Sequence, residues 1–117
     1  MMSIPQGYDT DRFTINASYN ILENGFDAGA RQVGTNGDTL HEIALDLMEF
    51  FASAADAASE FTPWGATDTG DYARLEIRGE VFKHDGEGSY LDEVNTVQIV
   101  IEAIERQGGG ASERITP

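Results

Sequence analysis

The chain is 117 residues long, free of cysteine and strongly acidic, with 21 Asp and Glu against 7 Lys and Arg and a net charge of −14. The lack of cysteine excludes disulfides, thiolate zinc sites, iron–sulfur clusters and thiol nucleophiles. The shortage of basic side chains disfavours direct contact with nucleic acid or an anionic membrane, because both need Lys and Arg to neutralise phosphate.

The first regular element is predicted after a polar segment. Residues 1–11 are expected to be a loosely ordered lead-in. Over residues 13–21 apolar and polar side chains alternate, which is typical of a strand with one buried face. Asn24 and Gly25 then suit a type I′ turn, because both tolerate positive φ, so residues 26–33 are expected to return as the second strand of a β-hairpin.

Residues 39–61 carry the clearest helical pattern. Thr39 and Glu42 fit a capping box, in which each side chain accepts a hydrogen bond from a backbone N–H at the helix start. Apolar residues then recur at steps of three and four and form one wide stripe: Leu40, Ile43, Ala44, Leu47, Met48, Phe51, Ala54, Ala55, Ala58 and Phe61. The helix is predicted to run from Leu40 to about Phe61, and Pro63 ends it.

The second half of the chain is expected to hold a loop and one or two further strands. Residues 62–70 are interpreted as the loop, and strict alternation over 73–81 predicts a strand with charged residues on its outer face. Residues 84–89 are a turn or loop that could connect a long hairpin. Residues 94–106 fit both a helix and a buried strand, and their β-branched run favours a strand to about Ile101 with a helical end.

Together these patterns predict an α+β fold, in which a small antiparallel sheet packs against one long amphipathic helix. The sheet would comprise the N-terminal β-hairpin plus one or two later strands. A single domain is expected over residues 12–107, followed by a flexible Gly-rich tail over 108–117. No basic leader and no apolar stretch of about 20 residues is present, so a soluble, cytoplasmic protein is expected, in the host cytoplasm if phage-encoded.

The most distinctive feature of the predicted helix is an acidic row opposite its apolar stripe. The row consists of Glu42, Asp46, Glu49, Asp56 and Glu60. It would span roughly 27 Å at about 1.5 Å per residue, and no Lys or Arg between Arg31 and Arg74 neutralises it. Trp64 follows and, if exposed, would suit an interface anchor. These six residues are the predicted partner-binding site; the alternatives are an ordinary solvated face and a tryptophan that caps the core.

Motifs for catalysis and for cofactors are weak. Only His41 and His84 could complete a Ser-His-Asp arrangement, and no nucleophile-elbow glycine pattern surrounds any serine. Neither phosphate-binding glycine motif, GxxxxGK[ST] or GxGxxG, is present. The acidic cluster over residues 84–93 lacks the spacing of an EF-hand calcium loop, so a polar turn is preferred there. We therefore predict no catalytic residue, no metal site and no cofactor.

The leading functional hypothesis is a non-enzymatic inhibitor that occupies a basic, nucleic-acid-binding groove of a partner protein, with carboxylates in the places of phosphates. In charge and size the chain is similar to the DNA-mimicking proteins by which phages block restriction or CRISPR nucleases, although no motif carries this likeness. One alternative is a structural or assembly subunit, such as a virion component or a secretion chaperone, that forms homo-oligomers and uses its charge for solubility. Another is a halophile-adapted domain with no dedicated acidic site.

Overall fold

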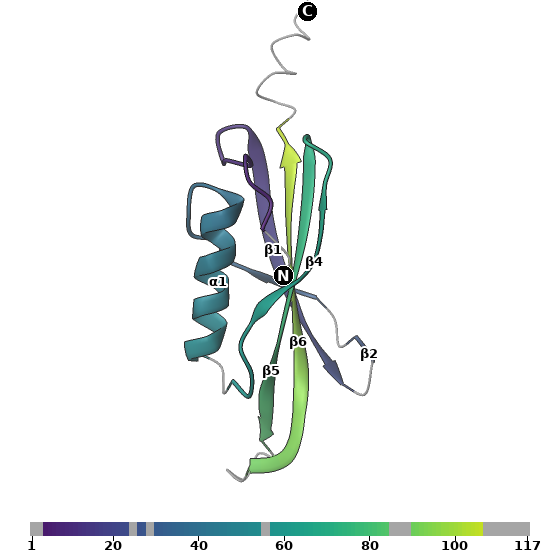
Figure 1. The fold of residues 1–117 in the computed structure, drawn as a ribbon. Coiled ribbons are helices and arrows are strands. Elements are labelled where there is room, and N and C mark those ends of the chain that lie inside the picture. The colour runs from purple at the N-terminus through teal and green to yellow at the C-terminus, as the bar shows by residue number, and fades with distance from the viewer. Residues whose placement is uncertain (1–3, 24–25, 28–29, 55–56, 85–89, 107–117) are drawn as a thin grey trace, which may run out of the picture.

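The described residues form a single antiparallel sheet with one α-helix lying along one of its faces (Figure 1). The computed structural model describes residues 4–23, 26–27, 30–54, 57–84 and 90–106. The elements in chain order are β1 (Phe13–Glu23), β2 (Phe26–Asp27), β3 (Arg31–Val33), α1 (Leu40–Ala54), β4 (Thr62–Asp68), β5 (Tyr72–His84) and β6 (Tyr90–Glu105). The sheet order is β2-β1-β6-β5-β4, and β3 also pairs with β1. No helix in these ranges is long and apolar enough to cross a membrane.

The predicted fold class is wrong: the described chain is mostly antiparallel sheet with one short helix, and not a small sheet packed against one long helix. Three strands have 11, 13 and 16 residues, whereas α1 has 15. The largest differences from the prediction lie in two segments. One was expected to be the second half of a long helix, and the other, between the helix and β5, was expected to be a loop.

Helix α1 begins where the sequence predicted and ends about seven residues earlier. The Glu42 amide donates to Thr39 Oγ1 at 3.1 Å, and Glu42 Oε1 accepts from the amide of Asp38 at 2.8 Å, which closes the cap. From Ala57 the chain pairs with the sheet instead, and the Ala58 amide donates to the Glu80 carbonyl at 2.6 Å. Alanine side chains have little apolar area to bury, so at the alanine-rich end of the predicted stripe backbone hydrogen bonds to β5 prevail over further helical turns.

Strand β4 occupies most of the segment that was predicted to be a loop. Pro63 lacks an amide hydrogen, so a strand that contains it belongs at the edge of a sheet, which is where β4 lies. The pairing with β5 shifts by one residue between Pro63 and Gly65, and this irregularity hides the strand from a search for alternation.

Strand β6 is extended throughout, and the helical end predicted near Arg106 is wrong. Along residues 96–104 it pairs with β1 on one side and with β5 on the other, so both rows of its backbone groups are satisfied. Such a central position outweighs any local helical preference. The predicted N-terminal hairpin is present, with Glu23 opposite Phe26 and Tyr19 opposite Arg31, while its turn residues lie outside the described ranges.

The core lies between α1 and one face of the sheet. Leu40, Ile43 and Leu47 of the helix belong to one cluster with alternate residues of the strands, among them Leu75 and Ile99. No charged side chain of the described residues is buried. We call the opposite side of the sheet, which α1 does not cover, the open face.

The segment before β1, which was predicted to be a loosely ordered lead-in, contributes to this core. Tyr8 is 2% exposed and packs edge-on against Phe13, with 4.8 Å between ring centroids. Its hydroxyl donates to the Asp68 carboxylate and accepts from the Gly70 amide at 3.0 Å. Burial, together with the hydrogen bond to Asp68, raises the pKa of Tyr8. The predicted tail, residues 108–117, lies outside the described ranges.

Candidate binding surfaces

Three of the five carboxylates in the predicted acidic row lie on the outward side of α1. Glu42 and Glu49 are exposed and Asp46 is half-buried. Because the helix ends at Ala54, Glu60 lies beyond it in the segment that leads to β4, and Asp56 lies outside the described residues. The row is therefore not a continuous stripe along one helix.

Two large apolar side chains lie beside these carboxylates. Leu45 is 49% exposed and Phe50 is 52% exposed. At 3.6 residues per turn Leu45 lies between Glu42 and Glu49, and Phe50 lies one turn after Asp46. We call these five residues the outward face of α1. Neither apolar member was predicted from the sequence. A signal for both was present, because Leu45 and Phe50 are large apolar residues that fall outside the predicted apolar stripe.

The outward face of α1 carries negative charge that no described cation neutralises. Among the described residues the ion pairs join Arg74 and Arg78 to Glu76, and none reaches the helix. The carboxylates of Glu42 and Glu49 thus face solvent and have no ionic partner among the described residues. Glu42 also caps the helix, so a variant that tests charge alone should leave it in place.

Trp64 lies on the other side of the sheet from these carboxylates. It is 59% exposed, so it does not cap the core. The guanidinium carbon of Arg78 lies 4.8 Å from the centroid of its ring. Arg78 alternates with the buried Ile77 along β5 and therefore points to the open face. The six predicted site residues consequently do not form one surface: those on α1 and Trp64 are separated by the sheet.

A pocket of about 340 Å³ opens beside Trp64 on the open face. It is lined by residues of β4, β5, β6 and the segment before β4: Ser59, Glu60, Thr62, Trp64, Arg78, Gly79, Glu80 and Thr96. Ser59 Oγ accepts a hydrogen bond from the Glu80 amide at 2.9 Å, which ties the segment before β4 to β5. Two residues of the predicted site, Glu60 and Trp64, are thus brought together here. We call this cavity the Trp64 pocket.

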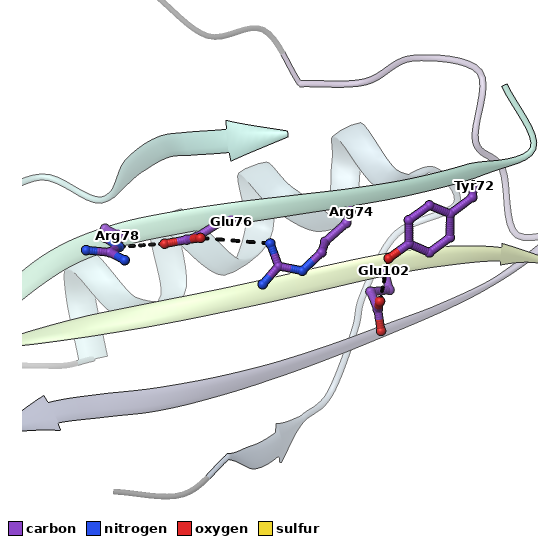
Figure 2. A network of polar contacts seen from close by, with 5 residues as sticks. All are labelled: Tyr72, Arg74, Glu76, Arg78 and Glu102. Carbon is purple, nitrogen blue, oxygen red and sulfur yellow. Dashed lines mark hydrogen bonds and ion pairs between the residues drawn. The ribbon is translucent and has the colours of Figure 1, made fainter. Parts of the chain in front are cut away.

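Next to the pocket, charged side chains of β5 form a network with one another (Figure 2). Glu76 accepts from Arg78 Nε at 2.5 Å and lies 3.9 Å from Arg74 Nη1. Burial by itself raises the pKa of Glu76, but hydrogen bonds from Gln98 and Arg78 and the two arginine charges outweigh it, and the pKa is lowered. Both arginines of this face therefore already have Glu76 as an ionic partner.

At the far end of the same network, Tyr72 donates to Glu102 Oε2 at 2.6 Å. This hydrogen bond, together with burial, raises the pKa of the Tyr72 hydroxyl. Tyr72 and Glu102 lie on neighbouring strands, so the bond links β5 to β6 across the open face. This end of the face is polar and internally bonded.

Within the described ranges no group of three or more His, Asp and Glu side chains is placed to hold a metal ion. His41 is half-buried on α1, and the side chain of His84 is not described. No family model, no curated protein and no solved structure matches the chain. The outward face of α1 and the Trp64 pocket are therefore the candidate binding surfaces of the described residues.

Proposed function

We propose that this chain is a non-enzymatic, acidic binding protein that presents the outward face of α1 to a basic surface of a protein partner. The observation that carries the proposal is the combination on that face of uncompensated carboxylates with Leu45 and Phe50, each about half exposed. An acidic face alone is well hydrated and gains little from contact. Apolar side chains of this size gain free energy when a partner covers them, and the surrounding charges select a basic partner.

The partner in this proposal is a protein that otherwise holds nucleic acid in a basic groove. Glu42, Asp46 and Glu49 follow one another along the helix axis at about 6 and 4.5 Å, a spacing of the same order as that of phosphates along a strand. A net charge of −14 speeds encounter with a cationic groove and weakens binding as salt rises. The chain would act in the cytoplasm by occupying the groove.

An assembly subunit is the second candidate, and the outer part of the β5–β6 hairpin favours it. The pairing of β1 with β6 ends at Thr96, so among the described residues the part of β6 before it pairs with β5 alone. Two-stranded ribbons are only marginally stable in water, and a neighbouring copy would stabilise this one. Phe82 and Val94 are opposite one another in this region and are both 39% exposed.

The experiment for the first candidate uses proteins that bind polyanions. A lysate of the native host is fractionated on heparin, and the retained proteins are passed over the immobilised chain. We expect capture of a basic protein that is released by duplex DNA or by raised NaCl, because carboxylates and phosphates compete for the same groove. Asp46→Lys/Glu49→Lys should abolish capture while keeping the helix cap. Leu45→Ala should weaken capture without changing its salt dependence.

A matched control separates local contact from overall charge. Asp11→Lys/Glu105→Lys makes the same change in net charge at exposed positions outside α1, so it should retain capture. Equal capture by both double variants would contradict the proposal. So would a captured protein that neither duplex DNA nor raised NaCl releases. Light scattering tests the second candidate, since an oligomer that persists at high salt supports assembly. A melting temperature that collapses when multimolar KCl is removed would instead indicate salt adaptation.

A further inference from the structure

The Trp64 pocket is distinct from the face that the proposed function uses. It lies on the open face, on the opposite side of the sheet from α1, and its volume of about 340 Å³ is at the lower end of the range for ligand sites. A cavity of that size fits one long side chain or a small organic ion. Its lining is polar apart from the indole, so charge and the aromatic ring decide what it holds.

The charge of the pocket is negative. Glu60 and Glu80 both line it, and neither has an ion pair with another described residue. Arg78 is the cation of the lining, but it is bound to Glu76 through its Nε atom. An incoming anion would meet two carboxylates and a guanidinium that is already engaged. An incoming cation would meet two carboxylates with oxygens able to accept from it.

Trp64 adds a preference for a flat cation. Its ring already receives the Arg78 guanidinium, with 4.8 Å to the ring centroid, yet the side chain stays 59% exposed. A second planar cation can therefore contact the indole from the solvent side. A guanidinium stacks on an aromatic ring and donates in a fork to carboxylates at once, whereas an ammonium is compact and more strongly hydrated. Both features of the pocket thus favour arginine over lysine.

We infer that the Trp64 pocket binds an arginine side chain presented by a protein partner. This inference rests on the proposed function, because the partner is the same basic protein. Nucleic-acid-binding grooves are lined with arginine, and a groove that encloses this two-layered domain would meet both α1 and the open face. The pocket would then fix the position of the domain in the groove, while the outward face of α1 supplies the long-range attraction.

The test uses the natural reporter in the pocket, since Trp64 is the sole tryptophan of the chain. The probes are three capped tripeptides with arginine, lysine or glutamate between two glycines, titrated at constant ionic strength while Trp64 fluorescence is recorded. We expect a saturable change with the arginine peptide, several-fold weaker binding of the lysine peptide and no binding of the glutamate peptide. Equal responses to all three peptides would overturn the inference.

Paired variants locate the site. Glu60→Gln/Glu80→Gln should weaken the arginine peptide by on the order of tenfold, since two charge-assisted contacts lose their charge. Asp11→Asn/Glu105→Gln removes the same charge at exposed positions outside both the pocket and α1, and should change the affinity less than about twofold, because exposed charges away from the pocket are screened. Equal affinities of the two double variants would place the peptide elsewhere and reject the pocket.

A measurement on the unmodified chain tests the inference even if a variant fails to fold. In two-dimensional NMR spectra the arginine peptide should shift the Trp64 indole N–H and the amides of Thr62 and Thr96, and leave α1 amides in place. Shifts confined to α1 would reject the pocket. The outcome is independent of the heparin experiment, because no partner is present: the pocket can bind arginine although no groove protein is captured, and capture can succeed through α1 while the pocket stays empty.

Discussion

The two faces of the β5–β6 hairpin have opposite character. The face under α1 carries residues that are at most 3% exposed: Ala73, Leu75, Ile77, Val97, Ile99, Ile101 and Ala103. The open face carries the residues between them, including Arg74, Glu76 and Arg78, which bind one another and remain partly exposed. Successive residues of one strand thus have opposite environments, as the period of two requires.

This difference shows how a domain with so much negative charge stays folded. The apolar face is covered by α1 and contains no charged side chain in the described ranges, so the packing there is not weakened by desolvated charge. The carboxylates lie on the outward face of α1 and on the open face, where water and the two arginines of β5 moderate their repulsion. Stability and recognition can therefore be tested separately by substitutions on the two faces.

The largest expected effect comes from neighbouring residues of β6 that face opposite ways. Ile99→Ala leaves a cavity under α1 and should lower the free energy of unfolding by about 3 kcal/mol. Val100→Ala, on the open face, should cost less than about 1 kcal/mol. Urea denaturation followed by circular dichroism gives both values. Similar losses for the two variants would mean that the open face is covered in solution, which would break the comparison.

A second substitution tests how tightly Phe61 packs against Gly79, at the margin of the face that α1 covers. A β-carbon at Gly79 would lie 2.5 Å from ring atoms of Phe61, so Gly79→Ala should displace that buried ring and cost about 1–3 kcal/mol. Gly65→Ala is the matched control, because a β-carbon there has nothing within 4 Å, and its effect should stay within about 0.5 kcal/mol. Thermal melting of both variants decides the point, and equal melting temperatures would contradict the packing of Phe61.

The smallest expected effect concerns the open face and depends on pH. Because the folded-state pKa of Glu76 is lowered, its contribution is present above the unfolded value near 4.5 and is lost as pH falls through the folded value. Glu76→Gln should therefore cost about 1 kcal/mol at pH 7, and this difference should shrink in acid. Urea denaturation between neutral and acidic pH measures it, with Glu105→Gln as an exposed control. A difference that persists at low pH would exclude the ion pairs as its cause.

The sequence predicted those parts of the fold that depend on local periodicity. The alternation in β1 and β5 and the cap at Thr39 are all present, because each is determined by neighbouring residues. The end of α1 and the existence of β4 depend on hydrogen bonds to β5, a strand that follows both in the chain. A segment that contains Pro63 and Gly65 has no local signal for a strand, so only the tertiary pairing reveals it.

The candidate surfaces were predictable to a smaller extent, for the same reason. The spacing of Glu42, Asp46 and Glu49 predicts that they share one side of a helix, and this prediction does not depend on where the helix ends. The prediction that the row extends to Glu60 depended on a helix that continues past Ala54. The association of Glu60 with Glu80 around Trp64 depends on β4 lying beside β5, and the period of the sequence holds no information about that arrangement.

The position of β6 affects how the molecule is made. This strand lies between β1 and β5 in the sheet, yet it is the last described element to leave the ribosome. Until it emerges, β1 and the β4–β5 pair have no common neighbour, and their apolar sides stay accessible to chaperones and to other nascent chains. Slower translation through residues 90–105 would lengthen that interval, and the high negative charge of the newly made chain would oppose its aggregation meanwhile.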